Sequence, residues 1–144
     1  MLTQSIEFLG QQVTSEGMSP TEEKLKVVRE WKVSKDVKNV RSFLGFANYY
    51  RRFVCKFAEV AHPLTELTKK GVAWQWGPME QRAFQTLKQR LCEAPILLYP
   101  DPQRPYTVVT DASGTAVGVV LMQDHGNGLQ PLAFMSRAFK PSEQ

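Results

Sequence analysis

The sequence changes character at residue 95. Before this point apolar residues recur at helical spacing, whereas prolines stand at positions 95, 100, 102 and 105 and short β-prone segments follow. Helices followed by a run of strands predict an α+β fold. We therefore expect a linker at 95–104 between a largely helical part and a β-rich part at 105–144.

The composition is that of an ordinary folded domain. The chain has 144 residues, of which 42% are hydrophobic and 22% charged, so it can bury a core. No apolar run approaches the ~20 residues of a membrane-spanning helix, and no secretory signal is visible. We expect an intracellular protein with no membrane partner. Cys55 and Cys92 are then reduced thiols, too few in number for a zinc site.

The first 18 residues predict a strand, a turn and a second strand, punctuated by Gly10 and Gly17. A helix should begin directly afterwards. Ser19 is expected to cap it, with Pro20 in the first turn and Glu22 closing an S-x-x-E capping box.

Two more helices are predicted before the linker. One covers 57–70, where His62 and Pro63 interrupt the pattern. The other begins at Gly77 and ends before Pro95, because Ala83, Phe84, Leu87 and Leu91 give it an apolar face.

The longest predicted helix covers 37–53, with Asp36 as its cap. At about 100° per residue, one broad side is apolar and a narrow line on the opposite side is polar. That line contains Arg41, Gly45, Asn48 and Arg52, with Lys38 and Tyr49 beside it. A glycine inside an exposed helix costs roughly 1 kcal/mol relative to alanine. Either another helix packs against Gly45, or a sugar–phosphate backbone approaches it between the flanking arginines.

Charge is distributed unevenly along the chain. Residues 19–57 carry ten Lys or Arg against four Asp or Glu, and residues 96–144 carry three against four. The basic middle part indicates either a surface that binds a polyanion or a solvated helical surface rich in lysine.

The β-rich part predicts strands at 106–110, 117–122 and 132–136, with a turn at 124–128. Asp111 follows the first of these strands. Its carboxylate could cap an Asx-type turn, or it could belong to a site at the strand end.

Three strings together resemble one protein family. VRSFLGFANYYRRF at 40–53 looks like the thumb helix of reverse transcriptases from LTR retrotransposons of the Gypsy class. YTVVTDASGTAVGVVL at 106–121 resembles the first strand pair of their ribonuclease H domain, and IEFLG at 6–10 resembles their primer-grip strand. The resemblance covers nearly the whole chain. It implies a palm-edge β-hairpin (1–18), a helical thumb and connection (19–94), and the first strands of an RNase H-like mixed sheet (105–144) of a Pol polyprotein.

The resemblance also implies roles for individual residues. The thumb helix of the family lies along the minor groove of the template–primer duplex, an RNA–DNA or DNA duplex. The residues implied to face it are Lys38, Arg41, Gly45, Asn48, Tyr49 and Arg52. Phe8, Leu9 and Gly10 would hold the primer end, and Asp111 would be a metal-binding carboxylate of the RNase H site. The intact parent would use Mg²⁺.

The chain departs from the family in its catalytic residues. The polymerase centre uses adjacent aspartates in a Y-x-D-D-type motif, and no such pair occurs here. Two-metal hydrolysis needs several carboxylates around ions ~3.5–4 Å apart, whereas the RNase H-like part offers Asp111, Asp124 and Glu143. We therefore expect neither catalysis nor a cofactor for this chain alone.

Three hypotheses follow for the function. In the first, the chain is a segment of a polyprotein, holds the duplex, and has the remainder of the polyprotein as a partner. In the second, it is a stand-alone, non-catalytic binding or interaction module derived from such an element. In the third, the basic helices are a purely structural bundle. The sequence does not indicate an oligomeric state.

Overall fold

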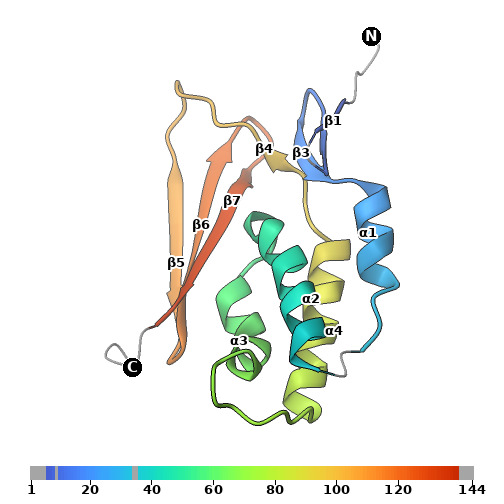
Figure 1. Ribbon diagram of the computed structural model, residues 1–144. Helices are drawn as coiled ribbons and strands as arrows, with labels where there is room; N and C mark the ends of the chain where they lie inside the picture. Colours follow the sequence, from blue (N-terminus) through green and yellow to red (C-terminus); the bar gives the residue numbers. More distant parts are fainter. Residues whose placement is uncertain (1–5, 9, 34–35, 140–144) are drawn as a thin grey trace.

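The computed structural model describes residues 6–8, 10–33 and 36–139, the first range by its backbone alone, and shows helices and two small antiparallel sheets (Figure 1). The predicted α+β class is confirmed. The elements are β1 (Ile6–Phe8), β2 (Gln11–Val13), β3 (Gly17–Pro20), α1 (Glu22–Arg29), α2 (Val37–Tyr49), η1 (Arg51–Phe53), α3 (Phe57–Leu67), α4 (Pro78–Cys92), β4 (Leu97–Leu98), β5 (Thr107–Ala112), β6 (Ala116–Asp124) and β7 (Leu129–Ala138).

The first sheet is larger than the predicted hairpin. Its strand order is β1–β2–β3–β4, so β4, which lies in the segment expected to be a linker, pairs with β3. Pairing with β2 holds Ser19 and Pro20 extended within β3, and the predicted capping box is therefore wrong. Thr21 caps α1 instead, and its side-chain oxygen accepts the Lys24 N–H at 3.3 Å.

The helices share one hydrophobic core. The apolar side of α2 faces it, and Phe43 and Ala47 are completely buried. The centre of the Phe43 ring lies 4.7 Å from the centre of the Phe84 ring on α4. The predicted apolar face of α4 is confirmed, because Ala83, Phe84, Leu87 and Leu91 are all buried.

Two helix boundaries differ from the prediction. α3 runs continuously through Pro63, so the expected interruption at 62–63 is wrong. α2 ends at Tyr49 and the 3-10 turn η1 follows, whereas one helix was predicted as far as 53. A 3-10 turn has 3.0 residues per turn and not 3.6, so side chains after Tyr49 no longer keep the angular positions of α2.

The second sheet has the strand order β5–β6–β7. Asp111 lies within β5, directly opposite Gly118 of β6. The turn comes after it, where the Ser113 hydroxyl accepts the N–H groups of Thr115 and Ala116 at 3.3 and 3.2 Å. Asp111 is therefore a strand residue and does not cap the turn.

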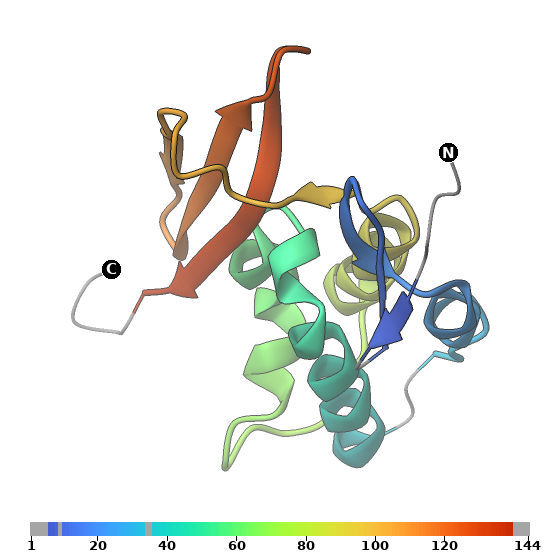
Figure 2. The same ribbon diagram turned by 90° about the horizontal axis from the view of Figure 1, so that it is seen from above.

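The second sheet lies beside the helices, with β7 facing them (Figures 1 and 2). Phe134 of β7 packs against the helical core. The fully buried Gln123 ties the sheet to the preceding loop, because its amide bonds the backbone of Asp101 and Arg104 at 2.8–3.0 Å. Among the described helices, none is both long and apolar enough to cross a membrane.

Candidate nucleic-acid interface

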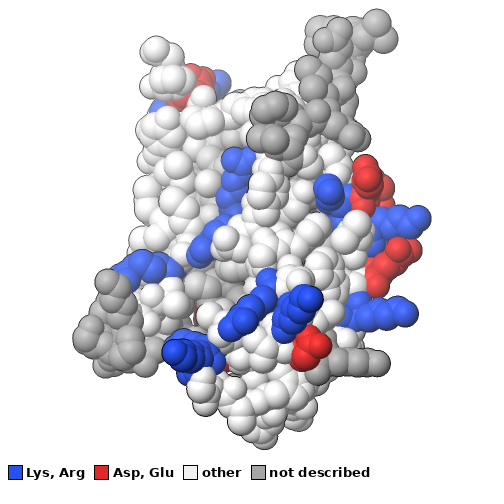
Figure 3. Space-filling view, in the orientation of Figure 1, with Lys and Arg blue, Asp and Glu red and all other residues white. Residues whose placement is uncertain are grey.

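An open basic surface covers the outer side of α2. Lys38, Arg41 and Gly45 are exposed there, and a Cβ added at Gly45 would meet no atom of the described residues within 4 Å. No helix therefore packs against this glycine. Figure 3 shows basic side chains along the middle of this face, whereas most of the acidic ones lie at its edge beside α1.

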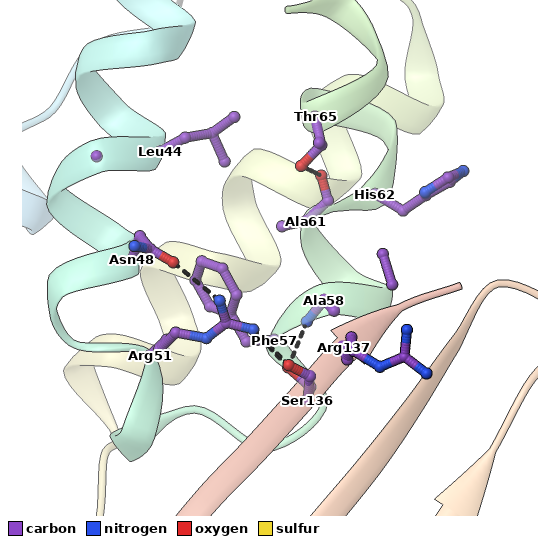
Figure 4. A pocket seen from close by; sticks show the side chains of 12 residues that line it. Leu44, Asn48, Arg51, Phe57, Ala58, Ala61, His62, Thr65, Ser136 and Arg137 are labelled. Atoms are coloured by element: carbon purple, nitrogen blue, oxygen red, sulfur yellow. Dashed lines mark hydrogen bonds between the residues drawn. The ribbon is translucent and has the colours of Figure 1, made fainter. Parts of the chain in front are cut away.

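Next to this surface lies a groove of about 470 Å³ between α2, α3 and β7 (Figure 4). Gly45 and Asn48 line one wall and β7 lines the other. The complete lining is Leu44, Gly45, Asn48, Arg51, Phe57, Ala58, Ala61, His62, Thr65, Ser136, Arg137 and Ala138. The groove thus combines an apolar floor with polar groups from both the helices and the second sheet.

Arg51 joins the two sides of the groove. Its guanidinium donates to Asn48 Oδ1 at 3.1 Å and to the carbonyl and hydroxyl oxygens of Ser136 at 2.5 and 3.3 Å. It also lies 5.1 Å from the centre of the Phe57 ring. The Ser136 hydroxyl in turn accepts the Ala58 N–H at 2.9 Å. Arg51 was not among the residues predicted to face a duplex, although the Arg51–Arg52 pair in the motif was a signal for it.

Arg52 was predicted to belong to the exposed line of α2, and that placement is wrong. Because η1 changes the angular position, Arg52 turns toward the first sheet, where its guanidinium donates to Gln11 Oε1 and contacts Met18 Sδ at 3.7 Å. Its Nε is buried and has no hydrogen-bond partner among the described residues. Arg52 therefore fixes the β2–β3 hairpin to the helices.

Other members of the predicted line remain at the surface. Arg41 donates to the carbonyl oxygen of Thr68 at 3.0 Å, which orients its guanidinium along the end of α3. Tyr49 is half exposed, and its ring meets the ring of Tyr50 edge-on at 4.9 Å.

Two of the predicted primer-grip residues are described: Phe8 ends β1, and Gly10 lies in the turn before β2. Gly10 has a φ of +76°, and its carbonyl oxygen accepts the Tyr50 O–H at 3.0 Å. Burial raises the pKa of Tyr50, with a smaller contribution from Tyr49. Phe8 pairs with Gln11, and Leu9 lies outside the described residues. The primer-grip role of these residues stays a prediction.

The carboxylate of Asp111 contacts an ammonium group. Lys56 Nζ lies 2.5 Å from Asp111 Oδ2, and the hydrogen bond and positive charge of Lys56 lower the pKa of Asp111. Within the described part of the chain, no three His, Cys, Asp or Glu side chains form a group that could hold a metal. One carboxylate already neutralised by a lysine does not fit the donor set of a divalent cation.

Comparison with known proteins supports a resemblance to retrotransposon Pol polyproteins. Residues 76–144 match the family described as the RNase H-like domain found in reverse transcriptase. The chain is 39% identical over 138 residues (96% of its length) to the retrovirus-related Pol polyprotein from transposon 412 of Drosophila melanogaster. It is also 39% identical over 120 residues (83%) to the transposon Tf2-3 polyprotein of Schizosaccharomyces pombe. It spans 11% and 9% of the length of these relatives.

Solved structures of a viral enzyme show the same fold. The foamy viral protease-reverse transcriptase in complex with dsDNA matches 99% of this chain and 30% of its own, with a TM-score of 0.80 and 27% identity. The complex with RNA/DNA hybrid matches 96% and 19%, with a TM-score of 0.78 and 27% identity. Residues 76–144 are thus similar to the RNase H-like domain found in reverse transcriptase, and the chain as a whole is similar to a segment of retrotransposon Pol polyproteins.

Proposed function

We propose that this chain is the duplex-holding segment of a reverse transcriptase with an RNase H-like domain, from an element of the Gypsy class. The observation that carries the proposal is the open side of α2, where Gly45 follows the exposed Lys38 and Arg41 and lies beside the groove. The reverse transcriptases of similar fold in complex with dsDNA and RNA/DNA hybrid support it.

The dimensions of α2 suit a duplex. Lys38, Arg41, Gly45 and Asn48 recur at helical spacing and cover about 15 Å of the helix at 1.5 Å per residue. A DNA duplex carries roughly nine phosphates over that length. The basic side chains would contact phosphates without reading bases, and the absent side chain at Gly45 lets the backbone approach.

The wall formed by Asn48 and Arg51 continues this surface toward β7. Because Arg51 is held by Ser136, a duplex on α2 would also meet the RNase H-like part. The chain would therefore position the template–primer relative to both the helical part and the RNase H-like part. The magnesium-dependent chemistry belongs, in this proposal, to other parts of the polyprotein.

The test measures binding of a labelled RNA–DNA hybrid and a DNA duplex across a salt series. Replacing both Lys38 and Arg41 with Glu should weaken binding of either duplex and reduce the slope of log K against log salt by roughly two, about 0.9 per phosphate contact. The matched control replaces Lys26 and Arg82 with Glu. These residues are also exposed, on α1 and α4, and the control makes the same change in net charge.

Equal losses in both double mutants would show that net charge, and not the α2 surface, drives binding. No measurable binding by the unaltered chain at low salt would favour the purely structural bundle. Arg52→Glu is unsuitable as a test, because it would disturb the contact with Gln11 as well as any phosphate contact.

A further inference from the structure

Lys56 stands in a place that local preferences disfavour. It is the one non-glycine residue with a left-handed backbone among those the structure describes, with a φ of +56°. It occupies the N-cap of α3 without a side-chain capping bond, where Ser, Thr, Asp or Asn would be preferred. Its positive charge also lies at the helix end that favours anions.

The surroundings hold this residue in position. Arg90 of α4 donates to the carbonyl oxygen of Cys55 at 2.6 Å, which anchors the turn just before Lys56. The side chain then crosses β6 at Gly118, where an added Cβ would lie 3.5 Å from Lys56 Cγ. Since Gly118 is opposite Asp111 in the sheet, this path leads the ammonium to the Asp111 carboxylate.

Residues that break several local rules at once are expected where a tertiary contact or a function requires them. For Lys56 that contact is the ion pair with Asp111 at 2.5 Å. We infer that Asp111 serves here as the docking partner of Lys56 and not as a metal ligand, so that the ion pair and a bound divalent cation exclude one another.

This ion pair is a polar connection between the sheet and the helices, in addition to the packing of Phe134. Another is Ser136, which accepts from Ala58 and Arg51. Both polar connections involve residues 51–58, from η1 to the first turn of α3. Lys56 Nζ must therefore leave the Asp111 carboxylate before Asp111 can take part in a metal site. The inference does not rest on duplex binding.

The first experiment measures hydrogen exchange of the Ala58 amide in the full chain, because this amide bonds Ser136 across the contact. Lys56→Met keeps the left-handed residue unbranched and removes the charge. Lys56→Met and Asp111→Asn should each speed the exchange roughly two- to fivefold, which corresponds to the free energy that an exposed ion pair contributes. The double mutant should exchange no faster than either single mutant. Lys56→Arg should restore the slow rate.

The control is Lys69→Met, which removes an exposed ion pair of similar geometry, Lys69 to Glu66 at 2.7 Å, at the other end of α3. It should leave the Ala58 amide unchanged. Unchanged exchange in Lys56→Met or Asp111→Asn would overturn the docking role, and so would multiplicative effects in the double mutant.

The second experiment adds Mn²⁺ and follows paramagnetic broadening of the Asp111 and Gly118 amide signals. The unaltered chain should show little broadening, Lys56→Met should show clear broadening, and Lys56→Met with Asp111→Asn should lose it again. Equal signals in the unaltered chain and Lys56→Met, whether both broadened or both unaffected, would overturn the mutual exclusion.

Discussion

Replacing Gly45 with alanine should make the protein more stable and, at the same time, weaken its hold on a duplex. Gly45 lies in the middle of α2, and an added Cβ would meet no described atom within 4 Å. Alanine therefore brings its helix preference of about 1 kcal/mol without a clash. With a urea dependence of about 1–3 kcal/mol per M, the midpoint of unfolding should rise by about 0.3–1 M.

Binding should change in the opposite direction. A methyl group at residue 45 would stand between the helix and an approaching sugar–phosphate backbone, and an isobutyl group would keep it farther away. We expect a several-fold loss of duplex affinity for Gly45→Ala and a loss of at least about tenfold, 1.4 kcal/mol, for Gly45→Leu. Leucine is nearly as good a helix former as alanine, so the leucine variant should also be more stable than the unaltered chain.

Urea unfolding and fluorescence anisotropy with a labelled RNA–DNA hybrid measure the two quantities. Gln85→Leu is the matched control, because it places the same side chain on an exposed part of α4 and should leave affinity unchanged. Gly45→Leu that is more stable but binds as well as the unaltered chain would refute the close-approach argument. A lower stability of Gly45→Ala would show instead that residue 45 is packed.

Three further predictions concern stability. Gly10→Ala should lower the free energy of unfolding by about 2–3 kcal/mol, since residue 10 is left-handed and an added Cβ would lie 2.4 Å from the Tyr50 oxygen. In a Tyr50→Phe background, which lacks that oxygen, the same substitution should cost about 1 kcal/mol less. Additive effects of the two substitutions in urea unfolding would contradict the clash. Gln123→Leu should cost about 2–4 kcal/mol, because backbone groups of Asp101 and Arg104 lose their partner, as measured by the same assay. Burial raises the pKa of Tyr50 above its ordinary value of 10.0. Its contribution to the free energy of unfolding is therefore fully present below pH 10 and should be lost as pH rises through the folded-state pKa. The free energy of unfolding of Tyr50→Phe should decline less over the same pH range.

Arg51 and Arg52 show which side-chain positions could not be predicted from the sequence. Helical periodicity correctly separated the buried side of α2 from its exposed side, because burial of Phe43 and Ala47 follows from spacing alone. Extending the same period past Tyr49 placed Arg52 on the surface and overlooked Arg51. The change to a 3-10 turn depends on how the chain packs against β7 and the first sheet, and spacing contains no information about it.

Asp111 gives a second example. The string around it was enough to predict a strand pair, which the pairing of β5 with β6 confirms, and to select the carboxylate as a candidate. Its partner could not be predicted, because Lys56 is far away in the sequence and nothing local indicates a left-handed lysine. The pairing of β4 with β3 could not be predicted either, because the two strands are far apart in the sequence.

Local chemistry thus determined part of the secondary structure of this protein. Apolar spacing defined the inner faces of α2 and α4, and the Gly77-Pro78-x-Glu80 start of α4 followed from capping, with Glu80 Oε1 accepting the Gly77 N–H at 2.8 Å. The tertiary structure decided which polar groups meet, namely Arg51 with Ser136 and Lys56 with Asp111. Such contacts join residues that only the packing of the sheet on the helices brings together, and their geometry depends on the whole core.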